Sequence, residues 1–232
     1  MALWTAQLSD LQRLHPDPAK RNETAELLGL LTPLVKALSS DLAVECTLLA
    51  MQVFGGHGYI RENGVEQHLR DVRIVGLYEG TNGVQAMDLL GRKVLADQGR
   101  QMGAFLDMAD AFAKACSPRE AMREFTEPLT KLVADIRQLT RELVDTSAQD
   151  PHAAGAAAAP YLRLVGHLAL AWSWARMAEV ALKNTGSTDP IYASKVATAR
   201  FYFQRLLPQT AALCGEIRAG SSALMEPAID LF

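Results

Sequence analysis

Residues 52–92 hold the side chains that could bind a phosphate-bearing ligand and remove a proton from a substrate. A glycine-rich turn, Gly55-Gly56-His57-Gly58, comes first, and Glu79 follows on a loop just before a helix start. Glycine permits positive φ and close approach of a ligand, and helix starts attract anions. A glutamate in an apolar pocket has a raised pKa, which suits a general base. These residue types alone leave open whether Glu79 is catalytic or only neutralises a helix start.

The elements that must position these residues are predicted to be helices. Apolar residues recur at helical spacing from a candidate N-cap, Asn22, towards Phe54, and the glycine turn ends that helix. A short charged segment and the loop 77–81 follow. Thr81 or Asn82 then caps another helix. Four apolar residues are expected on the inner face of that helix: Val84, Met87, Leu90 and Val94.

The rest of the chain is also predicted to be helical, because no run of alternating residues is long enough for a confident strand. The stretch 149–160, with Gly155 and flanking prolines, is expected to be a loop. The predicted helices cover 101–115, 118–146, 161–182, 190–206 and 209–219. The sequence therefore predicts an all-α fold, with an antiparallel helical bundle in residues 1–99 and a second helical domain in residues 100–232.

Composition and charge exclude several classes of function. The 23 basic and 26 acidic residues give a net charge of −3, and no basic cluster suggests nucleic-acid binding. The apolar runs are short and interrupted by charges, so no membrane span is expected. No His, Cys and carboxylate residues have metal-site spacing. The three cysteines, Cys46, Cys116 and Cys214, are expected to be reduced and packed, as in a cytoplasmic protein.

The motifs of residues 52–92 together resemble the C-terminal helical domain of the acyl-CoA dehydrogenase family. That domain has a glutamine, a glycine pair and a Gly-Tyr in one turn, then an Arg-Asp, then Tyr-Glu-Gly-Thr leading into a helix. This sequence has the same order: Gln52, Gly55-Gly56, Gly58-Tyr59, Arg70-Asp71 and Tyr78-Glu79-Gly80-Thr81. Since each motif is weak alone, the resemblance depends on their combination.

The second half resembles the additional C-terminal helical domain of the longer bacterial members of this family, which include enzymes acting on methylthioalkanoyl-CoA thioesters. The segments that carry this resemblance are 160–166, 195–202 and 206–208. The resemblance therefore covers almost the whole chain, but only the last part of such an enzyme. The N-terminal helical domain, the central β-domain and the start of the catalytic helical domain are absent.

The resemblance implies α,β-dehydrogenation of an acyl-CoA thioester with FAD as cofactor. Glu79 would remove the α-proton while the β-hydrogen leaves as hydride to flavin N5. In the family, the backbone N–H of this glutamate and a flavin ribityl hydroxyl polarise the thioester carbonyl, which makes the α-proton more acidic. The flavin would perform the redox step, and the protein would supply position and field.

The remaining site residues are also implied by the resemblance. The residues expected to contact FAD, in part across a dimer interface, are Gln52, Gly55, Gly56, Thr81 and Gly83. The residues expected to contact the acyl-CoA are Tyr78, Gly80 and Arg92. At position 83 many relatives carry glutamine or glutamate, so Gly83 leaves only backbone for the adenine. Phe54 is expected to pack, and Arg70 and Asp71 are expected to form a structural ion pair.

The absent domains imply partners. Apolar surface around Glu79 should be exposed, so self-association or marginal stability is expected unless another surface covers it. The chain would act as a homo-oligomer or with a partner chain that supplies the missing domains, or it would be a truncated product that cannot work alone. Electron-transferring flavoprotein is the expected acceptor. The rival interpretation is a non-catalytic helical assembly or regulatory module, against which the retention of Glu79 argues.

Overall fold

The computed structural model describes residues 1–227, which contain helices and turns but no strand. This confirms the all-α prediction. The α-helices are α1 (Ala2–Leu14), α2 (Pro18–Phe54), α3 (Val65–Arg73), α4 (Asn82–Met87), α5 (Arg100–Cys116), α6 (Arg123–Ser147), α7 (Ala153–Lys183), α8 (Pro190–Phe201), α9 (Thr210–Arg218) and α10 (Ser222–Met225). Two π-helices, η4 (Asp88–Val94) and η7 (Tyr202–Leu206), continue α4 and α8. Short 3-10 turns are η1 (Gly55–Tyr59), η2 (Arg61–Asn63), η3 (Ile74–Gly76), η5 (Leu95–Asp97), η6 (Glu120–Met122) and η8 (Leu207–Gln209).

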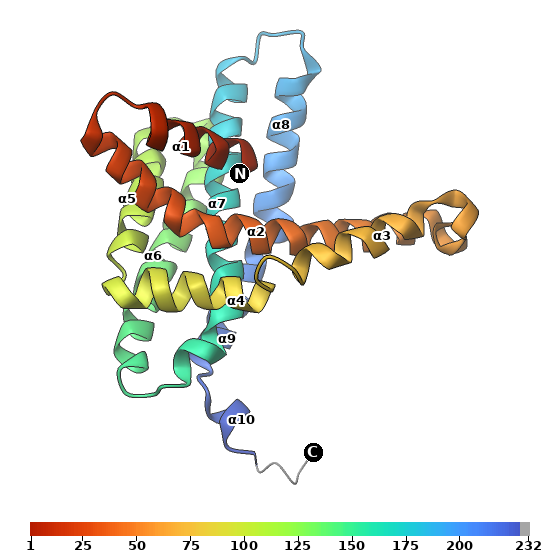
Figure 1. Cartoon of the computed structure of the whole chain (residues 1–232). Helices are drawn as coiled ribbons and strands as arrows, with labels where there is room; N and C mark the ends of the chain where they lie inside the picture. The colour runs from red at the N-terminus through yellow and green to blue at the C-terminus, as the bar shows by residue number, and fades with distance from the viewer. Residues whose placement is uncertain (228–232) are drawn as a thin grey trace.

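Helix α7 runs through the centre of the molecule, and α2, α4, α6, α8 and α9 all contact it (Figure 1). It is apolar nearly all round, as expected of a buried helix, and Leu164, Val165 and Leu168 have no exposed surface. One hydrophobic cluster joins these residues to Leu30 of α2 and Leu90 of η4. The core therefore continues across residues 97–101, where the sequence predicts a domain boundary.

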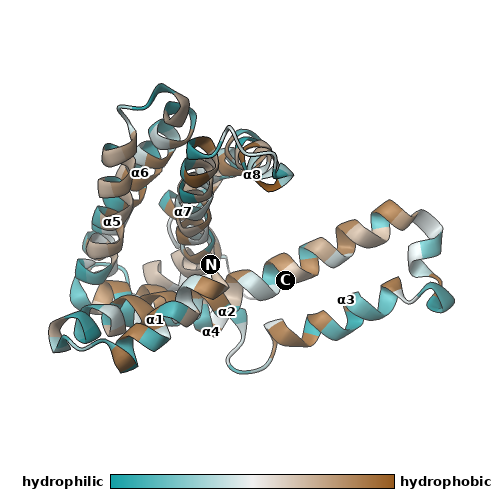
Figure 2. Ribbon diagram, turned by 90° about the horizontal axis from the view of Figure 1, so that it is seen from above, coloured by the Kyte–Doolittle hydropathy of each residue, from teal (hydrophilic) through white to brown (hydrophobic). Residues whose placement is uncertain are grey.

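Helix α2 is only half buried. Its first part contributes Leu31 and Leu34 to the core, with no exposed surface. Its second part leaves the bundle and pairs with α3, and the two helices form an arm, residues 42–76, that projects from the bundle (Figures 1 and 2). Leu49 and Val53 on this arm are 66% and 85% exposed. The apolar stripe of α2 thus continues along the sequence, but no described element covers its second half.

Length and composition alone would allow one described segment, Pro18–Tyr59, to cross a membrane. This is weak evidence, because the core helix of a soluble protein passes the same test. Its most apolar window is 39% buried within the protein, and the start of α2 packs in the bundle. The absence of a membrane span stays a prediction.

Helix α2 begins earlier than the sequence pattern predicts. The side chain of Asp17, rather than Asn22, caps it and accepts a hydrogen bond from the backbone N–H of Ala19 at 2.9 Å. Pro18 occupies the first helical position, where its missing N–H costs nothing. The Asp-Pro pair therefore starts the helix.

The predicted loop at 149–160 was largely wrong. Helix α7 begins at Ala153 and contains both Gly155 and Pro160. Ala157 and Pro160 are buried, so packing of this small-residue stretch outweighs the helix-breaking tendency of proline.

Two smaller expectations also differ from the structure in part. Helix α6 begins at Arg123 after the η6 turn, later than the predicted start at residue 118. The packing prediction for the cysteines holds for Cys116 and Cys214, but Cys46 is exposed on the arm.

Helices α2 and α7 approach each other closely at Gly166. A Cβ at this position would lie 2.9 Å from Cδ2 and 3.0 Å from Cδ1 of Leu38, a side chain that is 4% exposed. A buried leucine has little room to move in a close-packed core. Glycine at 166 therefore permits the contact that brings the base of the arm against α7.

We expect Gly166→Ala to lower the free energy of unfolding by about 1–3 kcal/mol, because the added methyl overpacks the α2–α7 contact. Gly155→Ala is the matched control in the same helix, since a Cβ there meets nothing within 4 Å; it should raise stability by about 0.5–1 kcal/mol. Urea unfolding followed by circular dichroism measures both. Equal effects of the two substitutions would contradict this account of the contact.

Helices α7 and α8 are joined by a buried polar pair. Tyr202 donates from its hydroxyl to the backbone carbonyl of His167 at 3.1 Å, and this hydroxyl lies 3.0 Å from Nδ1 of the His167 ring. Burial, with a smaller contribution from the positive charge of Arg163, lowers the pKa of His167 below its ordinary value of 6.5, and Glu45 opposes this shift. The folded state therefore favours the neutral imidazole.

A histidine with a lowered pKa binds more protons in the unfolded state, so its contribution to stability is lost as pH falls below about 6.5. We expect His167→Gln to make the free energy of unfolding less sensitive to pH between 7.5 and 5.5 than in the wild type. Urea titrations across that range measure it. Parallel pH profiles for the two proteins would refute a neutral buried His167.

Candidate active site

Glu79 lies on the loop between η3 and α4, at the base of the arm, and its backbone is in the left-handed region. Its φ is +56°, and the following Gly80 has φ +80°. For a residue with a Cβ this conformation costs about 1–2 kcal/mol relative to the right-handed one. Glycine would adopt it without strain, so the strained glutamate points to a requirement for its side chain.

A hydrogen-bond network ties this loop to α2. Lys36 donates from Nζ to the carbonyl of Gly80 at 2.7 Å and to Oδ1 of Asn82 at 3.0 Å. Asn82 donates from Nδ2 to a carboxylate oxygen of Asp41 at 2.6 Å and to Oγ of Ser40 at 2.9 Å. Lys36, Ser40 and Asp41 were not singled out from the sequence. Nothing in their spacing signals a contact with a loop so distant along the chain.

The start of α4 holds the loop from its other side. Thr81 is the N-cap and accepts a hydrogen bond from the backbone N–H of Val84 at 3.3 Å, which confirms one of the two predicted caps. Gln85 does not close a capping box; it donates from Nε2 to the carbonyl of Glu79 at 3.0 Å. Within residues 1–227 the carboxylate of Glu79 forms no hydrogen bond or ion pair and is left available.

Apolar side chains around Glu79 are exposed, as the sequence predicts. They are Ile74 (51%), Leu77 (50%), Tyr78 (48%), Val84 (54%) and Met87 (42%). Val84 and Met87 had been assigned to the inner face of their helix; only Leu90 and Val94 lie there, with no exposed surface. The difference arises because α4 starts at the edge of the bundle. An apolar pocket around Glu79 therefore needs surface from another polypeptide segment.

The glycine turn forms the tip of the arm. Gly55 has φ +59° and ends α2, and a Cβ at Gly55 or Gly56 would meet nothing within 4 Å. Gln52 is exposed beside them. Gly58 differs, because a Cβ there would lie 2.6 Å from the carbonyl oxygen of Met51. Gly58 thus permits the turn itself, while Gly55 and Gly56 leave backbone open to a ligand.

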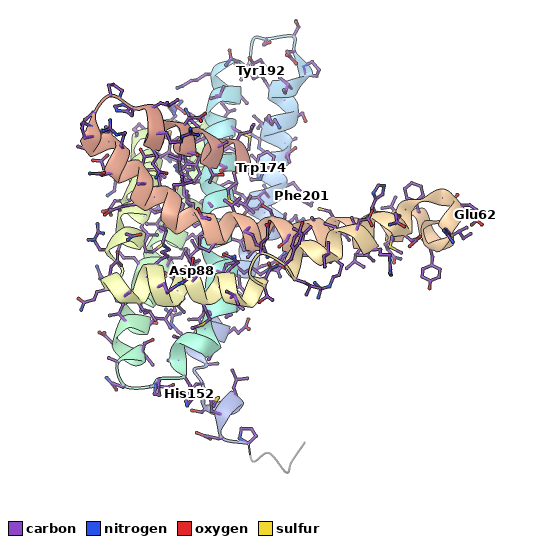
Figure 3. All side chains as sticks on the ribbon, in the orientation of Figure 1. Glu62, Asp88, His152, Trp174, Tyr192 and Phe201 are labelled. Carbon is purple, nitrogen blue, oxygen red and sulfur yellow. The ribbon has the colours of Figure 1, made fainter. Side chains whose placement is uncertain are left out.

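The structure separates the predicted FAD contacts into two groups. Gln52, Gly55 and Gly56 lie at the tip of the arm, where Glu62 marks its far end in Figure 3. Thr81 and Gly83 lie at the start of α4, which is close to the bundle in Figure 1. The nine residues of α3, about 13 Å of helix, run between the two ends. The predicted FAD contacts of one chain therefore fall into two separate groups.

Arg92, the predicted contact for the CoA part, lies on the π-helix η4. Its Nε pairs with a carboxylate oxygen of Asp88 at 2.5 Å, and its side chain is 76% exposed. π-Helical segments are frequent at functional sites. The pairing orients Arg92 on the surface, and its role in binding stays a prediction.

Two structural expectations on the arm were wrong. Phe54 is 54% exposed and does not pack in the core. Arg70 and Asp71 form no ion pair with each other in the described part of the chain; both lie on α3, where Asp71 accepts a hydrogen bond from Nε2 of Gln67 at 2.6 Å. Neighbouring residues on a helix point in different directions, which explains the absence of the pair. Arg70 instead lines a groove of about 910 Å³ between α2 and α3.

Comparison with known proteins assigns this chain to a class. A family described as "Acyl-CoA dehydrogenase, C-terminal domain" matches residues 1–95, and one described as "Acetyl-CoA dehydrogenase C-terminal like" matches residues 100–227. Together these matches cover almost all of the described chain. The chain belongs to the acyl-CoA dehydrogenase family.

Individual relatives agree with this assignment. The 3-methylmercaptopropionyl-CoA dehydrogenase of Ruegeria pomeroyi is 38% identical over 216 residues, which are 91% of this chain and 36% of that protein. The broad-specificity linear acyl-CoA dehydrogenase FadE5 of Mycobacterium tuberculosis is 28% identical over 77% of this chain and 31% of its own length. A butyryl-CoA dehydrogenase of Syntrophomonas wolfei is 32% identical over 86% of this chain and 33% of its own length. The chain thus spans about a third of the length of these relatives.

The hydrogen bonds of Asn82 with Lys36, Ser40 and Asp41 are expected to hold the Glu79 loop in place. We expect Asn82→Ala to speed amide hydrogen exchange in residues 77–81 and to lower the free energy of unfolding by about 1–3 kcal/mol, because Lys36 and Asp41 lose a shared partner. Asn22→Ala is the control, since Asn22 is exposed on α2. Exchange followed by mass spectrometry measures the loop. Unchanged exchange in Asn82→Ala would show that the network does not order it.

Proposed function

We propose that this chain is the C-terminal part of an FAD-dependent acyl-CoA dehydrogenase, in which Glu79 is the base that removes the α-proton of an acyl-CoA thioester. The observation that carries the proposal is the backbone of Glu79, a non-glycine residue held at φ +56° on an anchored loop. Strained backbone conformations cluster at functional sites. The family assignment supports the reaction class, because the relatives named above are acyl-CoA dehydrogenases.

The proposed reaction breaks the α-C–H and β-C–H bonds of the substrate and forms a double bond between these carbons. The carboxylate of Glu79 accepts the α-proton, and its backbone N–H donates to the thioester carbonyl to stabilise the developing enolate. FAD, when bound, supplies the acceptor for the β-hydride. Tyr78 and Gly80 flank the reacting carbons, and Arg92 approaches the phosphates of CoA. Apolar residues around the loop exclude water once they are covered.

The residues on the arm fit the flavin cofactor. The backbone of Gly55 and Gly56 is open because no side chain fills the space beside it, which allows a pyrophosphate or a planar group to approach. Thr81 and Gly83 present small, exposed groups at the other half-site. Since the half-sites lie at opposite ends of the arm, each FAD would contact the tip of one arm and the base of another. Gln52 at the tip extends the first of these contacts.

The partners follow from this arrangement. We infer a homo-oligomer, or a complex with a chain that supplies the missing domains, since the exposed apolar residues of the arm need a covering surface. Electron-transferring flavoprotein is the proposed electron acceptor, and the cytoplasm is the proposed location. A non-catalytic helical module is the less favoured alternative, because such a module would relax the strain at Glu79 by substitution with glycine.

The decisive experiment measures the rate at which the α-proton of the substrate exchanges with deuterium from D₂O. This rate reports proton removal by the catalytic base. The chain is joined to the N-terminal part of its Ruegeria pomeroyi relative and assayed with an acyl-CoA. We expect Glu79→Gln to slow exchange by about 10²–10⁴-fold, the usual contribution of a general base. Unchanged exchange would refute the assignment of Glu79.

Glu79→Gly separates strain from function. It should abolish exchange, yet leave the free energy of unfolding unchanged or raise it by up to about 1 kcal/mol, because glycine accepts positive φ. Gln98→Gly is the matched control, since Gln98 also has φ +56° but lies away from the site. It should have the same effect on stability and none on exchange. If Glu79→Gly destabilised the chain more than Gln98→Gly, the side chain would have a structural role instead.

Flavin retention tests the half-sites. We expect the isolated chain, incubated with FAD and desalted, to show no flavin absorption in its visible spectrum. The joined protein should retain stoichiometric flavin. Retention by the isolated chain would mean that its own oligomer forms a complete cofactor site, and the missing domains would not be required for binding.

A further inference from the structure

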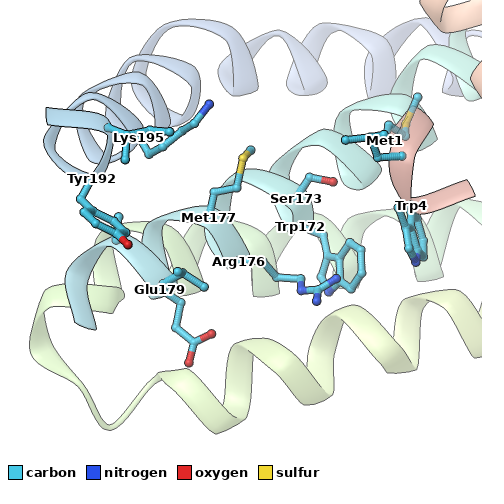
Figure 4. A pocket seen from close by; sticks show the side chains of 13 residues that line it. Met1, Trp4, Trp172, Ser173, Arg176, Met177, Glu179, Tyr192 and Lys195 are labelled. Atoms are coloured by element: carbon cyan, nitrogen blue, oxygen red, sulfur yellow. The ribbon is translucent and has the colours of Figure 1, made fainter. Parts of the chain in front are cut away.

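A second cavity, of about 460 Å³, lies between the start of α1, helix α7 and helix α8 (Figure 4). None of its lining residues belongs to the arm or to the Glu79 loop. One wall comes from residues 1–95 and the other from residues 100–227, the two segments that match separate family domains. Small-molecule sites occur preferentially at such junctions, and this volume lies within their usual range.

The wall of the cavity is mainly apolar and incompletely covered. Trp4 and Trp172 pack against each other with their ring centroids 4.6 Å apart. Val180 and Ile191 on the neighbouring helices are 53% and 51% exposed. Met177 of α7 also lines the cavity (Figure 4). These side chains would gain burial from an apolar ligand.

Two positively charged side chains, Arg176 and Lys195, also line this mainly apolar cavity. The Arg176 guanidinium carbon is 4.5 Å from the centroid of the Trp172 ring, and the Lys195 ammonium is 5.7 Å from that of Trp174. Neither cation forms an ion pair within residues 1–227. The one acidic residue in the lining, Glu179, is already paired with Arg119 and Lys183, each at 2.7 Å. The cavity therefore retains uncompensated positive charge.

The wall also contains an unsatisfied donor. Trp172 is 5% exposed, and its indole Nε1–H has no acceptor in the described part of the chain. A buried donor without a partner costs about 1–3 kcal/mol. Because the Nε1 atom itself is covered by protein, this donor belongs to the packed side of the ring and is not a contact for a ligand in the cavity.

From these features we propose that the cavity is a binding site for an amphipathic carboxylate, an unbranched apolar chain with one anionic head. The chain would lie along Trp4, Met177 and Ile191, and the carboxylate would meet Arg176 and Lys195. Charge complementarity selects an anion over a neutral amphiphile, and the apolar wall selects it over inorganic phosphate. The site is independent of the proposed chemistry at Glu79.

The chain contains an internal reporter for this site. Its three tryptophans are Trp4 and Trp172, which line the cavity, and Trp174, which lies beside Lys195. Decanoate, added below its micellar concentration, should change the intrinsic fluorescence saturably. Decanol, with the same chain but no charge, should bind at least tenfold more weakly.

Substitution of Arg176 and Lys195 tests whether these two cations bind the carboxylate of decanoate. We expect the double variant Arg176→Gln/Lys195→Gln to bind decanoate at least tenfold more weakly than the wild type. Arg141→Gln/Lys131→Gln removes the same charge from exposed positions on α6 and should bind as the wild type does. Circular dichroism confirms that both variants are folded. The proposal is overturned by no saturable change, by equal binding of decanol and decanoate, or by equal binding of the two double variants.

Discussion

The close approach of α2 to α7 is the contact on which the rest of the structure depends. At Gly166 the absence of a side chain lets Leu38 pack directly on α7. Leu38 is the last buried apolar residue of α2 before the helix leaves the bundle as an arm. Lys36, Ser40 and Asp41, within one turn of Leu38, hold the Glu79 loop through Asn82. The position of the candidate base is thus set by a helix-packing distance.

At the candidate active site the loop backbone is held in place, but the surroundings of the Glu79 side chain are open. The loop backbone is held by three elements, α2, η3 and α4, and keeps Glu79 in a strained conformation. Its side chain is nevertheless exposed, with apolar residues around it that nothing described covers. An anchored loop backbone beside uncovered apolar surface is what one component of a composite site should present. This agrees with a chain that spans about a third of its relatives' length.

The arm and the cavity lined by Trp4 and Trp172 lie on different parts of the molecule. The kind of surface that each offers to a binding partner is different. On the arm, glycine backbone and apolar side chains are exposed and would be covered by a large surface. In the cavity, two unpaired cations and an apolar wall suit a small anionic ligand. Helix α7 connects the two regions, since it packs on α2 at Gly166 and contributes Trp172 and Arg176 to the cavity.

Local sequence determined much of this protein. Apolar periodicity predicts most helices, glycines predict the turn at 55–58, and a cap predicts the start of α4 at Thr81. The motifs of residues 52–92 indicate the family only in combination, because each of them is weak alone. Tertiary structure decided what local patterns do not encode. It extended α7 through Pro160, since burial outweighs helix propensity, and it left Leu49, Val53 and Val84 exposed. It also joined Lys36 to the Glu79 loop, because such contacts depend on how distant helices pack.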